Sequence, residues 1–480
     1  MERPTREQLL YLCKHNPEVI VDLIEHLYDN LESLTAKVAL LEAEVKRLKD
    51  QLSKDSHNSH KPPSSDGPVK RTQSLRRKSQ RRAGGQKGHD GHGLKRIRVA
   101  DHEIMLPTPS VCPCGCRLDH ARKVSCESRQ VIDIPPIKVE ATDFKAEIVQ
   151  CPSCKEYVRA GFPSHVTRPV QYGPRLKSVA AYLINQHLVP YGRTAEILKD
   201  VFGQQMSTGT LYKINRELFR ALAQPVEKIK ARLIASPVVN FDETGLRIAT
   251  TGKWLHTAGT DQLTWYYPHA KRGREAMDEM AILPGFKGIA VHDHLKSYFA
   301  YDCEHSLCNA HHLRELTFLA EQHRQKWAKK MIKLLRKIKK EVDAAKRRNK
   351  LKLTPTKIVR FEQEYRDILA AGFLANPDYD PKRKRKKKTD PQRMLHRLKH
   401  FQKQTLAFMY DFDVPFDNNL AERDIRMTKV RQKISGCFRV HIGAEIFCRI
   451  RSYLSTSRKM GANQFEALHQ AMQGRFLEFS

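Results

Sequence analysis

The sequence predicts a multidomain α+β protein, and three features support that fold class. Its 480 residues, 40% of them hydrophobic, are enough for several cores. The apolar pattern changes along the chain from heptads to helical and then to strand-like spacing. A long basic stretch separates the strand-like part from the last helices. The expected parts are a coiled-coil helix (1–54), a basic flexible arm (55–103), a cysteine-rich segment (104–165), a helical region (166–235), the first part of an α/β domain (236–314), a basic α-helical insertion (315–411), and the completion of the α/β domain with C-terminal helices (412–480).

The net charge indicates a polyanionic partner. Lys and Arg number 86 against 53 Asp and Glu, a formal charge of +33, which suits phosphate neutralisation and therefore nucleic acid. No apolar run reaches the roughly 18 residues of a membrane helix, and the N-terminus lacks a secretory leader, so neither a membrane protein nor a secreted one is expected. The 11 cysteines are clustered and odd in number, which predicts a reduced cytoplasm and a metal site rather than disulfides.

An unbroken heptad pattern spans residues 20–52. The steps between its apolar positions alternate between four and three residues, and the flanking positions are charged, as in a two-stranded coiled coil. We expect a homo-oligomerisation helix; the alternative is an amphipathic helix docked on its own domain. The seam consists of Ile20, Ile24, Leu27, Leu31, Leu34, Val38, Leu41, Val45, Leu48 and Leu52.

Residues 55–100 are rich in Ser, His, Pro, Gly and cations and cannot build a core. This segment is either a flexible basic arm that follows DNA phosphates or a solvated linker, and one segment can be both.

Two cysteine turns follow, separated by the strand-like segments Glu127–Ile134 and Phe144–Val149. Two such turns joined by a hairpin predict a zinc ribbon, in which four thiolates bind Zn²⁺ and the ion substitutes for a core. The second turn has the usual C-x-x-C spacing, but the first is compressed, so its second ligand is open. The alternative is ordinary buried thiols. The candidate ligands, four of which would bind zinc, are Cys112, Cys114, Cys116, Cys151 and Cys154.

Residues 174–235 have helical spacing throughout. Arg193–Leu198, a break at Phe202-Gly203 and a helix that begins near Ser207 predict a helix-turn-helix. Its second helix would enter a DNA major groove. From the pattern alone, two packed helices in an all-α domain explain the segment equally well.

At Pro237 the pattern changes to strands. Strands are expected over 238–250, 254–258 and 263–267, then a helix over 273–280 and a buried strand over 288–293. Three strands, a helix and a strand are the order of a ribonuclease-H-like sheet, in which the first and fourth strands are neighbours.

In that topology Asp242 and Asp293 lie at the ends of neighbouring strands and face each other. Paired carboxylates suit Mg²⁺ or Mn²⁺, and two such ions about 3.5–4 Å apart support in-line phosphoryl displacement. Glu243 points to the opposite face by strand alternation and is the weaker candidate. The alternative for a lone strand-end Asp is a turn cap.

The third carboxylate is expected after a helical, basic insertion that includes the cationic run Lys382–Lys388. Asp417 is expected to cap a new helix that places Asn418, Glu422 and Arg426 on one face. Glu422 is the natural third metal ligand, although an ordinary salt bridge to Arg426 explains it equally well. The helix beyond Gly443 is expected to be core.

Another group of residues could form a second zinc site, but a short strand is expected to enter a helix there, which favours structural packing. These residues are Cys303, His305, Cys308, His311 and His312.

Several motifs together resemble the transposases of the insertion sequence 66 family, and they follow the family's order across nearly the whole chain. They are Asn58–Asp66, Gly84–His89, the cysteine turns, Phe241–Thr244, Cys308–Arg314 and Asp417–Arg423.

The resemblance implies a DDE-type transposase with a ribonuclease-H-like catalytic domain, which cuts the ends of its own element and joins them to target DNA. By position, it implies an acidic triad of Asp242, Asp293 and Glu422 that binds Mg²⁺ or Mn²⁺. Zn²⁺ is the expected second cofactor, and element-end and target DNA, a second copy of the chain and accessory proteins of the same element are the partners considered. The expected location is the bacterial cytoplasm, at the nucleoid. Rival interpretations are a catalytically silent DNA-binding protein and a nuclease without strand transfer. The cations expected to contact DNA are Arg193, Arg423, Arg426, Arg431 and Lys433.

Overall fold

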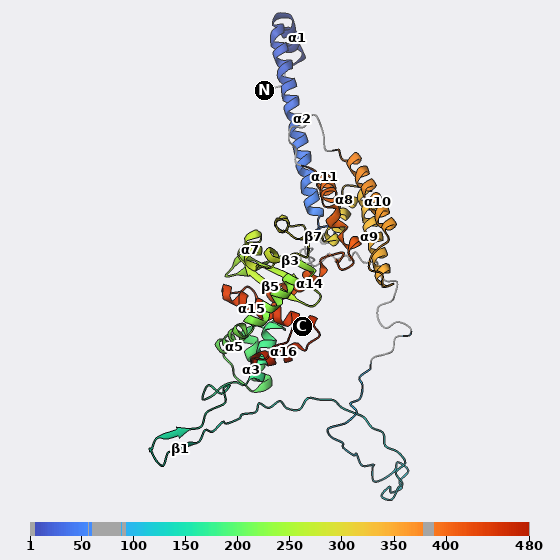
Figure 1. Ribbon diagram of the computed structural model, residues 1–480. Helices are drawn as coiled ribbons and strands as arrows, with labels where there is room; N and C mark the ends of the chain where they lie inside the picture. The colour runs from blue at the N-terminus through green and yellow to red at the C-terminus, as the bar shows by residue number, and fades with distance from the viewer. Residues whose placement is uncertain (1–4, 56, 60–87, 89–92, 378–387, 480) are drawn as a thin grey trace. The chain divides into compact units, whose positions relative to one another are not determined.

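The computed structural model describes residues 5–55, 57–59, 88, 93–377 and 388–479. The chain divides into two units, which are described separately. Unit 1 contains Met1–Leu75, Val170–Thr194 and Ser207–Ser480, and unit 2 contains Arg76–Pro169 and Ala195–Met206. The described residues form a mixed α+β structure (Figure 1). None of the described helices is both long enough and apolar enough to cross a membrane.

The heptad segment is one long helix. Helix α1 (Arg6–His15) is capped by Thr5, and α2 (Pro17–Ser53) follows with proline in its first turn, where a missing N–H has no cost. No residue of α2 is buried, and the seam residues Leu31 and Leu34 are 61% and 58% exposed. The docked alternative is therefore not observed for the seam among the described residues; α2 packs against α1 and meets the insertion at its C-terminal end, where Asp50 lies 3.4 Å from His323.

The region predicted to be helical is helical. It forms α3 (Pro174–Asn185), α4 (Tyr191–Phe202), α5 (Thr208–Ala221) and α6 (Ala223–Ala235). Gly203, in the left-handed region at φ 65°, ends α4, and Ser207 caps α5 by accepting a hydrogen bond from Thr210 N at 3.1 Å. The apolar face of α5 packs against α3, α15 and α16.

A five-stranded mixed sheet forms the centre of unit 1. Its strands are β3 (Val238–Ile248), β4 (Thr251–Gly259), β5 (Thr264–His269), β6 (Ile289–His292) and β7 (Glu304–Leu307), with α7 (Arg274–Met280) between β5 and β6. The strand order is β5-β4-β3-β6-β7. Strands β3, β4 and β5 are antiparallel neighbours, whereas β6 runs parallel to both β3 and β7. The prediction that the first and fourth strands, β3 and β6, are neighbours in the sheet is confirmed.

The C-terminal helices cover this sheet. Helix α15 (His441–Lys459) packs against β5, and Phe447 on it contributes to a core with Leu246 and Leu255. The predicted core helix is thereby confirmed. Helix α14 (Asn419–Ser435) packs on β3 and β4, and α16 (Gln464–Met472) packs on α3.

The insertion between β7 and α14 has its own core and is helical, as predicted, wherever the structure describes it. Helices α9, α10 and α11 lie side by side (Figure 1). The core includes Trp327, Leu334 and Tyr365 and extends to Val238 of β3. Most of the cationic run lies outside the described residues. The insertion helices are α8 (Asn309–Glu321), α9 (Lys326–Lys346), α10 (Pro355–Ala375), α11 (Asp390–His400), α12 (Gln402–Thr405) and α13 (Ala407–Tyr410).

Unit 2 contains one antiparallel strand pair, β1 (Ile148–Gln150) and β2 (Tyr157–Arg159). The expected strand over Glu127–Ile134 is wrong, because alternating apolar residues do not make a strand without a neighbouring strand to bond. The second expected strand begins at Ile148 rather than Phe144. The hairpin therefore encloses the second cysteine turn instead of joining the two turns.

Candidate active site

Three carboxylates predicted from the sequence converge at the centre of the sheet. Asp242 lies within β3, and Asp293 is the first residue after β6. The parallel register pairs Asn240 with Val291, so its continuation places Asp242 opposite Asp293. Burial raises the pKa of Asp242 well above its usual value, and the negative charges of Glu243, Asp293 and Glu422 raise it further. Asp293 and Glu422 thus both lie within electrostatic reach of Asp242.

The backbone fixes the orientation of both aspartates. Asp242 Oδ1 accepts a hydrogen bond from Glu243 N at 2.9 Å, and Asp293 Oδ1 accepts one from Leu295 N at 3.1 Å. The turn after Asp293 places His294 in the left-handed region at φ 81°, which is strained for a residue with a side chain. The turn therefore directs Asp293 at the cost of local backbone strain.

Glu243 is held by partners of its own. Arg272 donates to Glu243 Oε1 from Nε and Nη2 at 2.9 and 2.7 Å, and Tyr298 donates its hydroxyl to Oε2 at 2.7 Å. Arg272 Nη2 also lies 3.9 Å from Asp293 Oδ2, and its guanidinium sits over the ring of Trp254. Glu243 is therefore an anchor for Arg272, in agreement with its lower rank as a metal ligand. Sequence reasoning missed Arg272 and Tyr298, since neither lies in a motif.

Glu422 lies in the first turn of α14, whose start is tied to the central strand. Asn418 donates from Nδ2 to Phe241 O at 2.7 Å and accepts from Asn240 Nδ2 at 2.8 Å. The expectation that Asp417 caps this helix is off by one residue: Asn418 is the cap, and Asp417 Oδ1 accepts from Asn419 N. Asn418 occupies the cap position without a side-chain cap bond, because its amide bonds β3 instead.

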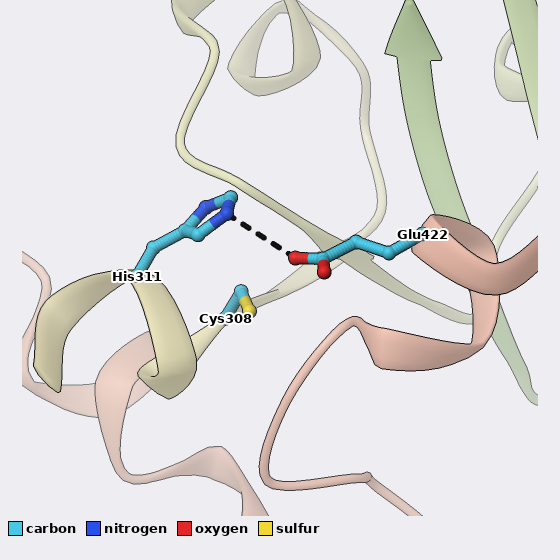
Figure 2. Close-up of side chains that lie close together, drawn as sticks. All are labelled: Cys308, His311 and Glu422. Carbon is cyan, nitrogen blue, oxygen red and sulfur yellow. Dashed lines mark ion pairs between the residues drawn. The ribbon is translucent and has the colours of Figure 1, made fainter. Parts of the chain in front are cut away.

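Helix α8 places His311 and Arg314 beside Glu422, and Figure 2 shows His311 pointing at its carboxylate. His311 Nε2 lies 3.3 Å from Glu422 Oε1, and Arg314 Nη2 lies 3.8 Å from Oε2. Burial raises the pKa of Glu422, but the hydrogen bond and charge of His311, together with Arg314 and Arg426, outweigh burial and lower it. Glu422 is thus held as a carboxylate, with Arg426 contributing from the same helix face.

The second cysteine and histidine group does not gather in one place. Cys308 and His311 approach Glu422, and their three ligand atoms lie within 4.8 Å of one another. His305 instead lies 3.2 Å from His292, and His312 is buried beside Asn309. The packing interpretation therefore fits His305 and His312, whereas Cys308 and His311 belong to the neighbourhood of Glu422.

The cations expected to contact DNA divide into two kinds. Arg193, Arg423, Arg426 and Lys433 are exposed. Arg431 is half-buried, with its guanidinium 3.6 Å from the ring centre of Phe438. Because that stacking removes Arg431 from the surface, it is better explained as a packing residue than as a DNA contact.

In unit 2 the two cysteine turns are closed by similar backbone hydrogen bonds, although the first turn is one residue shorter than the second. Lys155 N donates to Cys151 O at 2.9 Å, and Gly115 N donates to Cys112 O at 2.7 Å. Lys155 and Gly115 are both left-handed, at φ 63° and 90°. If the two left-handed residues, Gly115 and Lys155, are taken as equivalent, then Cys114, which precedes the first, corresponds to Cys154, which precedes the second. Among the described residues, no three of the cysteine sulfurs of the two turns lie within 4.8 Å of one another.

Comparison with known protein families identifies the chain's relatives. A family profile described as a family of unknown function (DUF6444) matches residues 14–95. No curated protein matches the chain. A profile described as the Transposase IS66 family matches residues 169–446, which is more than half of the chain and includes Asp242, Asp293 and Glu422. The chain therefore belongs to the IS66 family of transposases.

Proposed function

We propose that this chain is a DDE-type DNA transposase that cleaves the ends of its own insertion sequence and joins the 3′-hydroxyl ends to target DNA. The observation that carries the proposal is that Asp293, directly after β6, and Glu422 of α14 both lie within electrostatic reach of the partly buried Asp242 of β3. Family membership supplies the class of reaction.

The donor set fits Mg²⁺ or Mn²⁺. All three side chains offer carboxylate oxygens, the ligands that these ions prefer. Burial is the main cause of the raised pKa of Asp242, and the negative charges of Glu243, Asp293 and Glu422 add to it; a divalent cation would stabilise the carboxylate form against both effects. When bound, the cations would activate the attacking oxygen and stabilise the leaving oxygen of an in-line displacement. Asp242, Asp293 and Glu422 would hold them.

The remaining roles fall to residues of the chain. Glu243 and Arg272 keep a positive charge beside Asp293, and the exposed Arg423 and Arg426 suit the phosphates of the bound DNA strand. In the first step water adds to phosphorus and the bond to the 3′-oxygen breaks, which leaves a 3′-hydroxyl and a 5′-phosphate. In the second step that hydroxyl loses its proton and attacks a target phosphodiester, and the target 3′-oxygen that leaves takes up a proton and becomes a hydroxyl.

The cysteine turns would bind Zn²⁺ and contribute to DNA binding. The correspondence between the two left-handed residues supports four ligands: Cys112, Cys114, Cys151 and Cys154. Cys116 lies after the left-handed residue of its turn and is not included. Backbone N–H groups of Ser153 and Cys154 lower the pKa of Cys151, and the backbone of Cys116 lowers that of Cys114. Both effects favour thiolates, the form that binds zinc.

The exposed seam of α2 would pair two copies of the chain. A row of apolar residues at heptad spacing, none of them buried, is satisfied by a second such helix. Pairing serves the proposed reaction because two element ends must be brought together.

The test is cleavage and joining of labelled DNA that carries the ends of the element, with Mg²⁺ or Mn²⁺, comparing wild type with Glu422→Gln. Glu466→Gln is the matched control, since Glu466 also lies in the first turn of a helix but is exposed. Joined products that disappear with Glu422→Gln and persist with Glu466→Gln support the proposal. Binding without cleavage would favour the silent DNA-binding protein, and cleavage without joining would favour the nuclease.

A further inference from the structure

A cluster of three possible ligands lies beside the triad and includes atoms that Mg²⁺ does not favour. The Cys308 sulfur, a ring nitrogen of His311 and a carboxylate oxygen of Glu422 all lie within 4.8 Å of one another (Figure 2). Thiolate and imidazole are the donors of Zn²⁺ and similar ions, whereas Mg²⁺ selects oxygen. The cluster therefore has the donor chemistry of a different class of ion from the one expected at the triad.

Two helix starts position these ligands. Cys308 is the N-cap of α8 and His311 lies three residues later in its first turn, while Glu422 lies in the first turn of α14. Cysteine and histidine at this spacing fall on one side of a helix start. The side chains of His311 and Glu422 are 14% and 20% exposed, so an ion can reach the cluster from their side, although Cys308 itself is buried.

The sulfur of Cys308 accepts a backbone hydrogen bond of the kind that metal-bound thiolates accept. Asn418 N donates a hydrogen bond to Cys308 Sγ at 3.1 Å, from the start of α14. Backbone N–H groups aimed at a sulfur stabilise its negative charge, as do helix N-termini. Burial nevertheless raises the pKa of the Cys308 thiol to about 12, so a bound ion must displace its proton.

We propose that Cys308, His311 and Glu422 form a binding site for a transition-metal ion of the Zn²⁺ class. Three protein ligands leave a further position for water. Since Glu422 is also the third member of the triad, the ion at this site would withdraw Glu422 from Mg²⁺. That consequence rests on the proposed function, whereas the binding of the ion does not.

The test counts metal ions bound to the full chain without DNA. Each protein is dialysed against Zn²⁺ in the presence of excess Mg²⁺, and the bound zinc is measured by atomic absorption. The variants are Cys308→Ser and His311→Gln. The matched control is Cys448→Ser, which changes an equally buried cysteine in α15, away from the cluster.

Wild type and Cys448→Ser are expected to bind one more zinc ion per chain than Cys308→Ser and His311→Gln. Zinc bound at the cysteine turns of unit 2 contributes equally to all four proteins and cancels in this difference. Equal counts in all four would overturn the proposal, and if Cys308→Ser does not fold, the count for His311→Gln decides.

A second measurement identifies the sulfur ligand. Co²⁺ replaces zinc, and the thiolate-to-cobalt absorption band is expected to be weaker in Cys308→Ser than in Cys448→Ser; equal bands would contradict a Cys308 ligand. Neither measurement involves DNA, so a failure of the transposase proposal, such as full cleavage by Glu422→Gln, is distinguishable from a failure of this one.

Discussion

Replacing Asn418 by alanine tests whether one buried amide holds the third carboxylate on the sheet. The side chain of Asn418 bridges two residues of β3: it donates to Phe241 O at 2.7 Å and accepts from Asn240 Nδ2 at 2.8 Å. Asn418 is 1% exposed and Asn240 is 5% exposed, so water cannot replace either bond without opening the structure.

The expected loss of stability follows from these two bonds. Removing one partner of a buried hydrogen bond costs about 1–3 kcal/mol for the polar group left behind. Asn418→Ala leaves two such groups without their partner, so we expect the free energy of unfolding to fall by about 2–6 kcal/mol. On the proposed function, end cleavage should fall as well, because Glu422 lies one turn beyond Asn418 in α14.

The assay is urea unfolding followed by tryptophan fluorescence. Two of the three tryptophans, Trp254 and Trp265, lie in β4 and β5 and report on the sheet. Asn419→Ala is the matched control, since Asn419 is the next residue, is exposed, and should change the free energy of unfolding by less than about 0.5 kcal/mol. If Asn418→Ala costs no more than Asn419→Ala, Asn418 does not tether α14.

Three further predictions concern charge, pH and assembly. Arg426→Ala should reduce the slope of the log DNA-binding constant against log salt concentration by about 0.9, as expected for one lost phosphate contact. Arg431→Met should leave that slope unchanged but lower the free energy of unfolding by about 1–2 kcal/mol. DNA titrations in which both variants change the slope equally would contradict this division. Burial lowers the pKa of His256 to about 4 and of His312 to about 3. Below about pH 6.5 the unfolded chain therefore binds more protons than the folded one, so the free energy of unfolding should fall with pH by up to about 1.4 kcal/mol per pH unit for each histidine. Unfolding midpoints in urea that do not move between pH 7 and 5 would refute this pH dependence. Leu34→Lys should convert a dimer to a monomer in light scattering, and a wild type that is already monomeric would exclude pairing through α2.

Much of the fold follows from local patterns in the sequence. The heptads predict α2, and alternating apolar residues predict the strands of the sheet in their correct order. Asp293 was identifiable because it directly follows a predicted strand, and Asp242 because it lies in the strand predicted to be its neighbour. The prediction that Glu422 is the third ligand required both a predicted helix start and a family resemblance. A glutamate four residues before an arginine is common in helices and would not have been sufficient.

The contacts that complete the site lie beyond local patterns. Glu243 meets Arg272 and Tyr298, which are 29 and 55 residues away along the chain. Asn240 and Asn418 are 178 residues apart. Such pairs depend on how the sheet and insertion pack, which no periodicity encodes. The misplaced strand at Glu127–Ile134 has the same cause, because strand formation requires a neighbour elsewhere in the chain.

The ends of the insertion explain how so long a segment can separate two members of one triad. Asn309, where α8 begins, donates from its backbone N to Phe416 O at 3.1 Å and from its side chain to Thr405 O at 2.9 Å. A second hydrogen bond joins Cys308, the residue before Asn309, to Asn418, two residues after Phe416. The chain thus leaves and re-enters the α/β domain at one point, and the insertion packs mainly on its own core. Because Glu422 follows this point by one helical turn, its position depends on that closure rather than on the length of chain between α8 and α14.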